Sequence, residues 1–273
     1  MKKIDLHVHS SCSDGNLTIA EILNLAKNSN LSTIAITDHE TIINLLNYEE
    51  LEQKYGLSII PGIELPTDIF KMHIVGYGIK DMSSLESEMN ALRIENEKHN
   101  RETIDILARD GVDISYDSVK LLANGPNITY RDIVKYLYIK GYVNDPRDAF
   151  RKYIGQGCKA YVPSRSLSAN EVLNLIDSCG GISILAHPFT INKDIELDCL
   201  VGDLKSNGLS GIEIYPPKLT SAQFDEYRRL AKKYQLIETI GTDFHNSSYH
   251  ELGVLMDDDY VLEITQVLKR GKV

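Results

Sequence analysis

Three features are scarce in this sequence of 273 residues: long apolar runs, closely spaced cysteines and excess positive charge. No stretch approaches the roughly 20 apolar residues that a membrane-spanning helix needs. Charged side chains interrupt the N-terminus too early for the apolar region of a signal peptide. We therefore expect a cytoplasmic protein with no membrane partner.

The four cysteines, Cys12, Cys158, Cys179 and Cys199, form no Cys-x-x-Cys pair. Their spacing argues against a zinc ribbon, a redox motif or a small disulfide scaffold, and it favours reduced thiols. The net charge of −10 also provides no basic face for duplex DNA. A small anionic substrate stays compatible with this charge if bound cations offset it locally.

Short apolar runs alternate with helical patterns at both ends of the chain, which predicts an α/β fold with a parallel sheet or a barrel. Strands are expected at residues 4–8, 33–37, 57–63, 72–78, 182–186, 212–215 and 236–241. Helices are expected near residues 18–28, 41–55, 169–179, 197–206, 221–234 and 260–269, the first and third opening with a capping box. Residues 83–154 show only helical patterns, so we predict a barrel domain at 1–82 and 155–273 with a helical insertion at 83–154.

Six of the eight histidines fall at, just past or within expected strands, and these are His7, His9, His39, His73, His187 and His245. In parallel α/β barrels the carboxyl ends of the strands form the functional face. His7 and His9 stand two residues apart on one strand, so both imidazoles point to the same face. Imidazoles grouped in this way suit a divalent ion.

Carboxylates accompany these histidines at Asp14, Asp38, Glu64 and Asp243. Each has an ordinary explanation when taken alone: a glycine turn for Asp14, for example, or a helix cap for Asp38. Glu64 ends the third strand, where a carboxylate commonly bridges two ions. Their convergence with the histidines predicts a polynuclear metal site.

The combined motifs resemble the polymerase-and-histidinol-phosphatase (PHP) superfamily of metallophosphoesterases. They are Asp5-Leu6-His7-Val8-His9, Thr37-Asp38-His39, Ala186-His187-Pro188 and Gly241-Thr242-Asp243-Phe244-His245, in that order. The resemblance implies a distorted (β/α)7 barrel. Segments 141–143, 149–150 and 157–163 are similar to the subgroup that contains AMP phosphatases, nucleoside 3′,5′-bisphosphate phosphatases and 5′-to-3′ exonucleases of short RNA.

Carried over by position, the resemblance implies three metal ions and nine ligands. One ion takes His7, His9, Glu64 and Asp243; a second shares Glu64 and adds His73 and His187; a third takes Asp14, His39 and His245. Nitrogen and oxygen donors without thiolates suit Mn²⁺, Zn²⁺ or Fe²⁺, and we expect two or three divalent ions, with Mn²⁺ first.

Substrate contacts follow the subgroup less closely, because Tyr130-Arg131-Asp132 stands where members often show Arg-Pro-His. Arg131 is the expected phosphate contact, with Arg101 and Lys159 as alternatives. Tyrosines of the insertion are candidates for stacking on a base, although helix packing explains most of them, and they are Tyr130, Tyr136, Tyr138 and Tyr142.

We expect hydrolysis of nucleotide phosphate monoesters by a metal-bridging hydroxide. Asp14, His187, Asp243 and His245 are the candidates for proton transfer. The expected substrates are a nucleoside 3′,5′-bisphosphate, AMP or a short 5′-phosphorylated single-stranded RNA.

Three alternatives stay open at this point. One is a histidinol-phosphate phosphatase, which would share the metals but not the substrate. Another is an amidohydrolase-like enzyme, against which the lack of a lysine among the strand-end motifs argues. The last is a metal-binding regulatory module without catalysis.

Overall fold

The computed structural model describes residues 1–42, 47–123, 128–163, 165–215, 219–246 and 251–272. Contacts divide the chain into two compact units, residues 1–86 with 166–273 and residues 87–165. No helix among the described residues is long and apolar enough to cross a membrane. The limits 83–154 for the inserted segment stay a prediction.

The larger unit is built on one sheet of eight strands in the order β7-β6-β5-β4-β3-β2-β1-β8. The strands are β1 (Lys2–Val8), β2 (Leu31–Ile36), β3 (Ser58–Pro66), β4 (His73–Tyr77), β5 (Ile182–Leu185), β6 (Gly211–Tyr215), β7 (Ile237–Ile240) and β8 (Val254–Met256). Val8, at the end of β1, forms a parallel bridge with Phe244, beyond β7, so the sheet nearly closes on itself. The α/β barrel predicted from the sequence is confirmed.

The sheet is mixed rather than wholly parallel. β4 is antiparallel to both β3 and β5, and β8 is antiparallel to β1, whereas the other neighbours are parallel. Pro66 pairs with His73, so residues 67–72 alone join β3 to β4. So short a connection makes a hairpin, because a parallel crossover needs a dozen or more residues.

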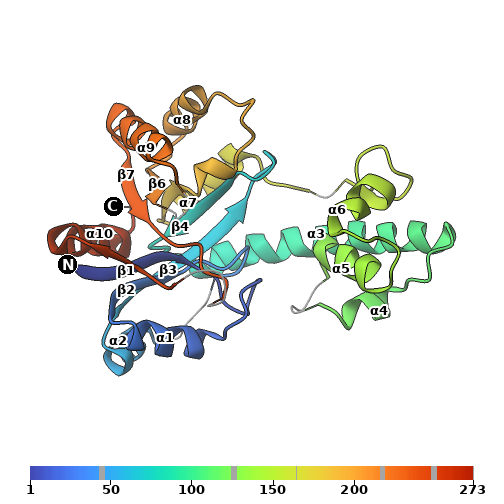
Figure 1. The fold of residues 1–273 in the computed structure, drawn as a ribbon, viewed down its shortest axis with the longest axis horizontal. Helices are drawn as coiled ribbons and strands as arrows, with labels where there is room; N and C mark the ends of the chain where they lie inside the picture. Colours follow the sequence, from blue (N-terminus) through green and yellow to red (C-terminus); the bar gives the residue numbers. More distant parts are fainter. Residues whose placement is uncertain (43–46, 124–127, 164, 216–218, 247–250, 273) are drawn as a thin grey trace. The chain divides into compact units, whose positions relative to one another are not determined.

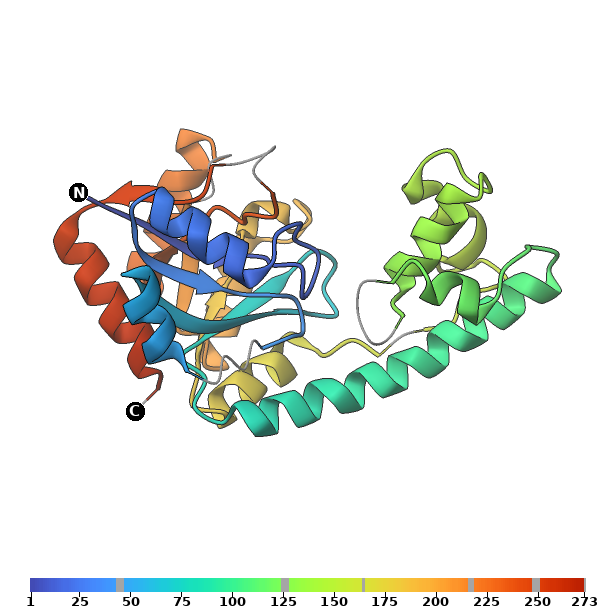
Figure 2. The same cartoon turned by 90° about the horizontal axis from the view of Figure 1, so that it is seen from below.

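Helices cover the outside of this sheet (Figure 1; Figure 2). They are α1 (Ile19–Asn28), α2 (Tyr48–Tyr55), α7 (Ala169–Ser178), α8 (Leu197–Ser206), α9 (Ser221–Tyr234) and α10 (Asp258–Arg270). Both predicted capping boxes are present, at Thr18 and Ser168. The helix predicted from residue 41 begins only at Tyr48, and residues 43–46 lie outside the described part.

Two buried clusters hold these layers together. In one, Ile22 and Leu23 of α1 pack with Ile34 of β2. In the other, α10 buries Val261, Ile264 and Leu268 against the sheet. Those three positions recur at helical spacing, and each buried side chain contributes roughly 1.5–3 kcal/mol. This packing fixes the strand ends on which the site depends.

The smaller unit contains helices and no strand among its described residues. Its helices are the later part of α3 (Met82–Arg109), α4 (Tyr116–Lys120), α5 (Tyr130–Ile139), α6 (Pro146–Ala149) and a π-helical turn at Phe150–Ile154. It has a core of its own, which includes Leu107, Ile133 and Leu137. The smaller unit thus has a hydrophobic core separate from those of the barrel.

Candidate metal centre

The side chains predicted as ligands meet at one edge of the barrel sheet. His7, His9, His39, His187, Asp243 and His245 lie at or just beyond the ends of β1, β2, β5 and β7, and Glu64 lies near the end of β3. His73 is the first residue of β4, and the reversed direction of that strand brings its start to the same edge. Asp14 reaches the group from the loop after β1.

Glu64 is the fully buried centre of the group. Its Oε1 lies 3.0 Å from His73 Nδ1 and 2.8 Å from His187 Nε2. These contacts come from β4 and from the segment after β5, on one side of the carboxylate. One oxygen of Glu64 therefore faces two imidazoles of the predicted second ion.

The other oxygen of Glu64 faces three more imidazoles. Oε2 lies 3.3 Å from His7 Nε2, 3.2 Å from His9 Nε2 and 3.2 Å from His39 Nδ1. The carboxylate thus stands between two sets of nitrogen donors, as a bridging ligand does. Among the described residues, however, Oε2 is one of four buried polar side-chain atoms without a hydrogen bond.

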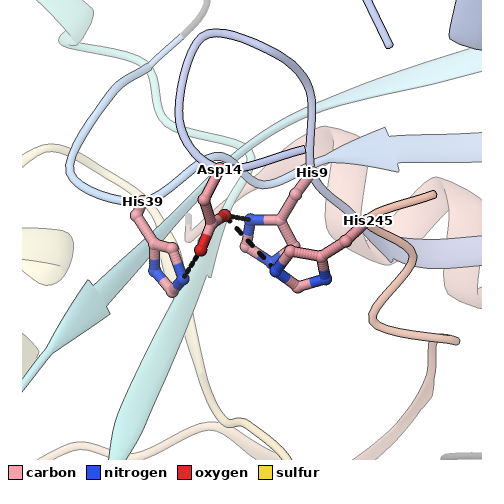
Figure 3. Close-up of side chains that lie close together, drawn as sticks. All are labelled: His9, Asp14, His39 and His245. Carbon is pink, nitrogen blue, oxygen red and sulfur yellow. Dashed lines mark ion pairs between the residues drawn. The ribbon is translucent and has the colours of Figure 1, made fainter. Parts of the chain in front are cut away.

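Asp14 is the centre of a second group, which is less buried than the group of His7, Glu64 and His187 (Figure 3). Its Oδ1 lies 3.6 Å from His9 Nδ1 and 3.3 Å from His245 Nε2, and its Oδ2 lies 3.6 Å from His39 Nε2. The four side chains come from three strand-end segments and one loop, and they point toward a common centre.

Asp243 lies between the two groups. Its Oδ1 is 3.2 Å from His9 Nε2 and 3.6 Å from His7 Nε2. Both Asp243 and His187 have a positive φ, 53° and 24°. Residues with a β-carbon adopt such a backbone at a cost, and this cost is commonly stored at functional sites.

These distances fit a set of cation ligands. Ligand atoms bound at about 2.0–2.2 Å to one ion lie roughly 3.0–3.6 Å from each other, which is the spacing around Glu64 and Asp14. A buried oxygen facing three ring nitrogens without a hydrogen bond is explained by a cation between them. Four sets of donor atoms lie within 4.8 Å of one another: His9, Asp14, His39 and His245; His7, Glu64 and His187; His7, His9 and Asp243; His39, Glu64 and His73.

These sets divide the ligands differently from the family resemblance. The Asp14 group gains His9, and Glu64 is grouped with His39 as well as with His73. Shared donors of this kind are expected where ions stand a few ångströms apart. Which residue binds which ion stays a proposal.

The cluster has opposite effects on the pKa values of its bases and acids. Burial alone would lower the pKa of His7, but the carboxylates of Glu64 and Glu213 outweigh it, and the pKa lies well above its ordinary value. Burial also opposes a charge on His9, yet its contacts with Asp243 and Glu64 raise its pKa to about 9. Without a cation, the acids therefore hold protons on these rings.

The carboxylates respond in the reverse direction. Burial would raise the pKa of Asp14, Glu64 and Asp243, but neighbouring imidazoles outweigh it and hold all three below their ordinary values. The main opposing contacts are from His245 to Asp14 and from His9 to Asp243. The acids are thus ionised across the physiological range, ready to bind positive charge.

Sequence reasoning missed Glu213, a buried carboxylate in the middle of β6. Its Oε1 lies 3.2 Å from His7 Nδ1, and its Oε2 accepts a 2.7 Å hydrogen bond from the backbone N–H of His187. Because a carboxylate only accepts, His7 must carry its proton on Nδ1 to complete this bond. The Nε2 lone pair is then directed at the candidate site. The sequence did contain a signal for Glu213, since an acid between two isoleucines of an apolar strand is unusual.

Asp38 has a supporting role that differs from the helix cap considered from the sequence. It accepts hydrogen bonds from Ser10 N at 2.7 Å, Ser10 Oγ at 2.6 Å and Ser13 Oγ at 2.5 Å. All of these donors lie in the loop that carries Asp14. Asp38 therefore fixes the loop that delivers Asp14 to the cluster.

Asp5 has a comparable role at the base of the site. It accepts hydrogen bonds from Thr242 Oγ1 at 2.6 Å, Thr242 N at 3.0 Å and Gly253 N at 2.9 Å. Burial nevertheless raises its pKa to about 6. Gly241 stands beside this anchor because a β-carbon there would lie 2.2 Å from His7 Cβ.

The predicted substrate contacts lie in the smaller unit. Arg101 pairs with Glu97 at 2.9 Å and lies over the ring of Tyr116, and Lys159 pairs with Asp110. Arg131 lies in the first turn of α5. Their roles toward a substrate stay predictions.

The candidate stacking tyrosines divide into two kinds. Tyr136 is buried and donates to Asp113 O, and Tyr142 accepts from Asp113 N, so both serve the packing of the unit. Tyr130 and Tyr138 are largely exposed.

Comparison with known proteins agrees with this geometry. The family model of the PHP domain matches residues 5–162. A 5′-3′ exoribonuclease of Haemophilus influenzae is 33% identical over 94% of this chain and 95% of its own length. A 3′,5′-nucleoside bisphosphate phosphatase of Chromobacterium violaceum is 27% identical over 90% of this chain and 88% of its own.

Solved structures with a similar fold support the same family. A crystal structure from Bifidobacterium adolescentis covers 98% of this chain and 96% of its own, with a TM-score of 0.75 and 24% identity. With the buried clusters of imidazoles and carboxylates, these comparisons identify the chain as a metal-dependent phosphoesterase that belongs to the PHP domain family.

Proposed function

We propose that this phosphoesterase hydrolyses phosphate esters of nucleotides, with a nucleoside 3′,5′-bisphosphate, AMP or the 5′ end of a short RNA as substrate. The observation that carries the proposal is the donor cluster around Glu64 and Asp14, which can hold more than one cation. The relatives named for nucleotide and RNA substrates support that choice of ester.

We assign the ligands as the family positions suggest: His7, His9, Glu64 and Asp243 for one ion, Glu64, His73 and His187 for another, and Asp14, His39 and His245 for a third. When bound, divalent ions of the Mn²⁺, Zn²⁺ or Fe²⁺ type would lower the pKa of water and offset the charge that develops on the phosphate. Glu64 bridges the first two sets and keeps them close together.

Exposure indicates the side from which a substrate enters. The side chains of Asp14, Asp243 and His245 are about one-third exposed, at 35%, 35% and 32%, whereas that of His187 is 6% exposed. A phosphate ester can thus reach the first three without rearrangement. We assign proton transfer to the leaving oxygen to this exposed group and not to His187.

The contacts of His187 instead suit a ligand whose ring is held in one orientation. Its Nδ1 lies 3.0 Å from Thr190 Oγ1, whose hydroxyl has a carbonyl acceptor at 2.9 Å on Lys71 and another at 2.9 Å on His187. This chain of contacts places the proton on Nδ1 and leaves Nε2 facing Glu64.

A panel of four substrates tests the proposal: AMP, adenosine 3′,5′-bisphosphate, a short 5′-phosphorylated RNA and histidinol phosphate, each with and without Mn²⁺. We expect metal-dependent release of phosphate or nucleotide from at least one of the first three, at a kcat/KM above that for histidinol phosphate. Turnover of histidinol phosphate alone would contradict this proposal and support a histidinol-phosphate phosphatase. Metal binding without any turnover would support a regulatory module.

A further inference from the structure

The hairpin between β3 and β4 carries an exposed aromatic side chain at the edge of the metal centre. Thr67 N donates to Met72 O at 3.0 Å, which closes the turn over residues 68–71. Phe70 at its tip is 77% exposed, although only two residues separate it from His73. Aromatic side chains are among the residues that line small-molecule sites, so a ring at this position is available to a ligand bound at the metal centre.

Lys71 follows with a backbone that is unusual for its residue type. Its φ is 62°, in the left-handed region that glycine and asparagine favour. Its Nζ lies 5.5 Å from the centroid of the Phe70 ring, so the ammonium and the ring form one polar and aromatic surface. A strained backbone beside a functional site commonly reflects use of the side chain it presents.

The segment after β5 contacts the hairpin through Thr190. Thr190 Oγ1 lies 2.9 Å from two carbonyl oxygens, those of Lys71 and His187, and 3.0 Å from His187 Nδ1. Phe189, next to Thr190, is half-buried and meets the His187 ring edge-on, with 6.3 Å between ring centroids. Two of the chain's five phenylalanines therefore stand on the two segments that Thr190 joins.

We propose that Phe70 and Lys71 form the base and distal-phosphate subsite of this enzyme. The Phe70 ring stacks on the nucleobase of a nucleotide whose scissile phosphate is held at the metal centre, and the Lys71 ammonium contacts the second phosphate of a bisphosphate. Thr190 is a positioning residue that keeps the hairpin in register with His187. This inference rests on the proposed nucleotide phosphatase activity and adds the residues that select the substrate.

The test for Phe70 compares AMP with ribose 5-phosphate, which lacks only the base. Stacking on an aromatic side chain accounts for roughly a 5- to 150-fold gain per base. We expect Phe70→Ala to lower the ratio of kcat/KM for AMP to that for ribose 5-phosphate by about 5- to 100-fold. Phe70→Leu should lower it too, and Phe70→Trp should preserve it. Phe224→Ala is the matched control, because Phe224 carries a cation–π contact on α9, and it should keep the wild-type ratio.

The test for Lys71 compares adenosine 3′,5′-bisphosphate with AMP. Lys71→Met should raise KM for the bisphosphate about tenfold and shift KM for AMP by less than threefold. Lys54→Met is its control, since Lys54 lies over the ring of Tyr55 on α2.

The outcomes separate this inference from the function on which it rests. A wild-type enzyme that hydrolyses neither nucleotide nor the short RNA contradicts the proposed function and the subsite together. A wild-type enzyme that hydrolyses the RNA but neither nucleotide overturns the subsite alone. A wild-type enzyme that hydrolyses AMP, but with Phe70→Ala and Phe70→Leu ratios within twofold of wild type, overturns the base subsite alone. Equal KM changes for AMP and the bisphosphate in Lys71→Met overturn the distal-phosphate assignment.

Discussion

Replacing Glu213 with glutamine should change which nitrogen of His7 carries the proton. The carboxylate now accepts from two donors, the backbone N–H of His187 at 2.7 Å and the ring Nδ1 of His7 at 3.2 Å. Glutamine has the same shape but only one accepting oxygen. The backbone donor of His187 cannot reverse, so the amide oxygen stays with it and the NH₂ group faces His7.

His7 then has to accept at Nδ1 and carry its proton on Nε2. That nitrogen lies 3.3 Å from Glu64 Oε2 and 3.2 Å from His9 Nε2, in the middle of the predicted first metal site. A protonated Nε2 has no lone pair for a cation. Loss of such an orienting partner typically costs 10- to 100-fold in metal affinity or activity, about 1.4–2.7 kcal/mol.

The assay is competition for Mn²⁺ against a chelator, together with kcat/KM for the best substrate of the panel. Thermal unfolding of the metal-free proteins checks that the variant is folded. Glu238→Gln on β7 is the matched control, because its carboxylate lies 3.6 Å from Arg228 Nε and is partly exposed. Wild-type Mn²⁺ affinity and activity in a folded Glu213→Gln variant would refute the tautomer argument.

Asp38→Ala should lower the free energy of unfolding by about 2–4 kcal/mol, because it leaves buried loop donors without an acceptor. Asp38→Asn should lower the free energy of unfolding by less. Equal denaturant midpoints for the two variants would contradict this prediction. His9→Ala and Asp243→Ala should each abolish metal-dependent turnover while keeping the wild-type circular dichroism spectrum, and wild-type rates in both would remove the first metal site. Metal affinity should rise between pH 6 and pH 9 and then level off. The neighbouring carboxylates raise the pKa of His9 to about 9 in the free site, so a metal ion must displace the proton of the His9 ring below that pH. Calorimetry in buffers of different ionisation enthalpy measures the released protons, and an affinity that is flat over this range would argue against the mechanism.

The strand-end positions of the histidines were readable from the sequence. Apolar runs mark where strands stop, so the sequence alone predicts that His7, His39 and His187 lie at one edge. The antiparallel strands of the sheet were not predicted, although the short connection between β3 and β4 favours a hairpin. That reversal is what gives His73 its place among strand-end residues.

The supporting carboxylates show where sequence reasoning stops. Glu213 stands out as an acid in a buried strand, but the alternation of a strand gives the face of a residue and not its partner. Asp38 adjoins a predicted ligand, and a helix cap was as reasonable as its true contact with the Asp14 loop. The contact of Asp38 depends on the pairing of β1 with β2, and that of Glu213 with His7 depends on the near closure of the sheet.

Two short elements were not predicted from the sequence, for a different reason. β8 has three residues, all at least partly exposed, so no apolar pattern marks it. The π-helical turn at Phe150–Ile154 follows directly on α6, and its residue types do not distinguish it from the end of an ordinary helix. Neither contributes to the candidate site.

The reversed direction of β4 also determines how the inserted residues are attached. The chain leaves β4 at the edge away from the metal centre, where Lys80 N donates to Cys179 O at 2.9 Å. It returns at the other edge, where Asp68 N donates to Leu167 O at 2.8 Å, and then descends through the ten residues of α7.

Those ten residues span about 15 Å. Anyone who removes residues 83–165 to make a minimal barrel cannot close the gap with a tight turn. The replacement has to climb the height of the sheet, which takes about five extended residues before the cap of α7 at Ser168.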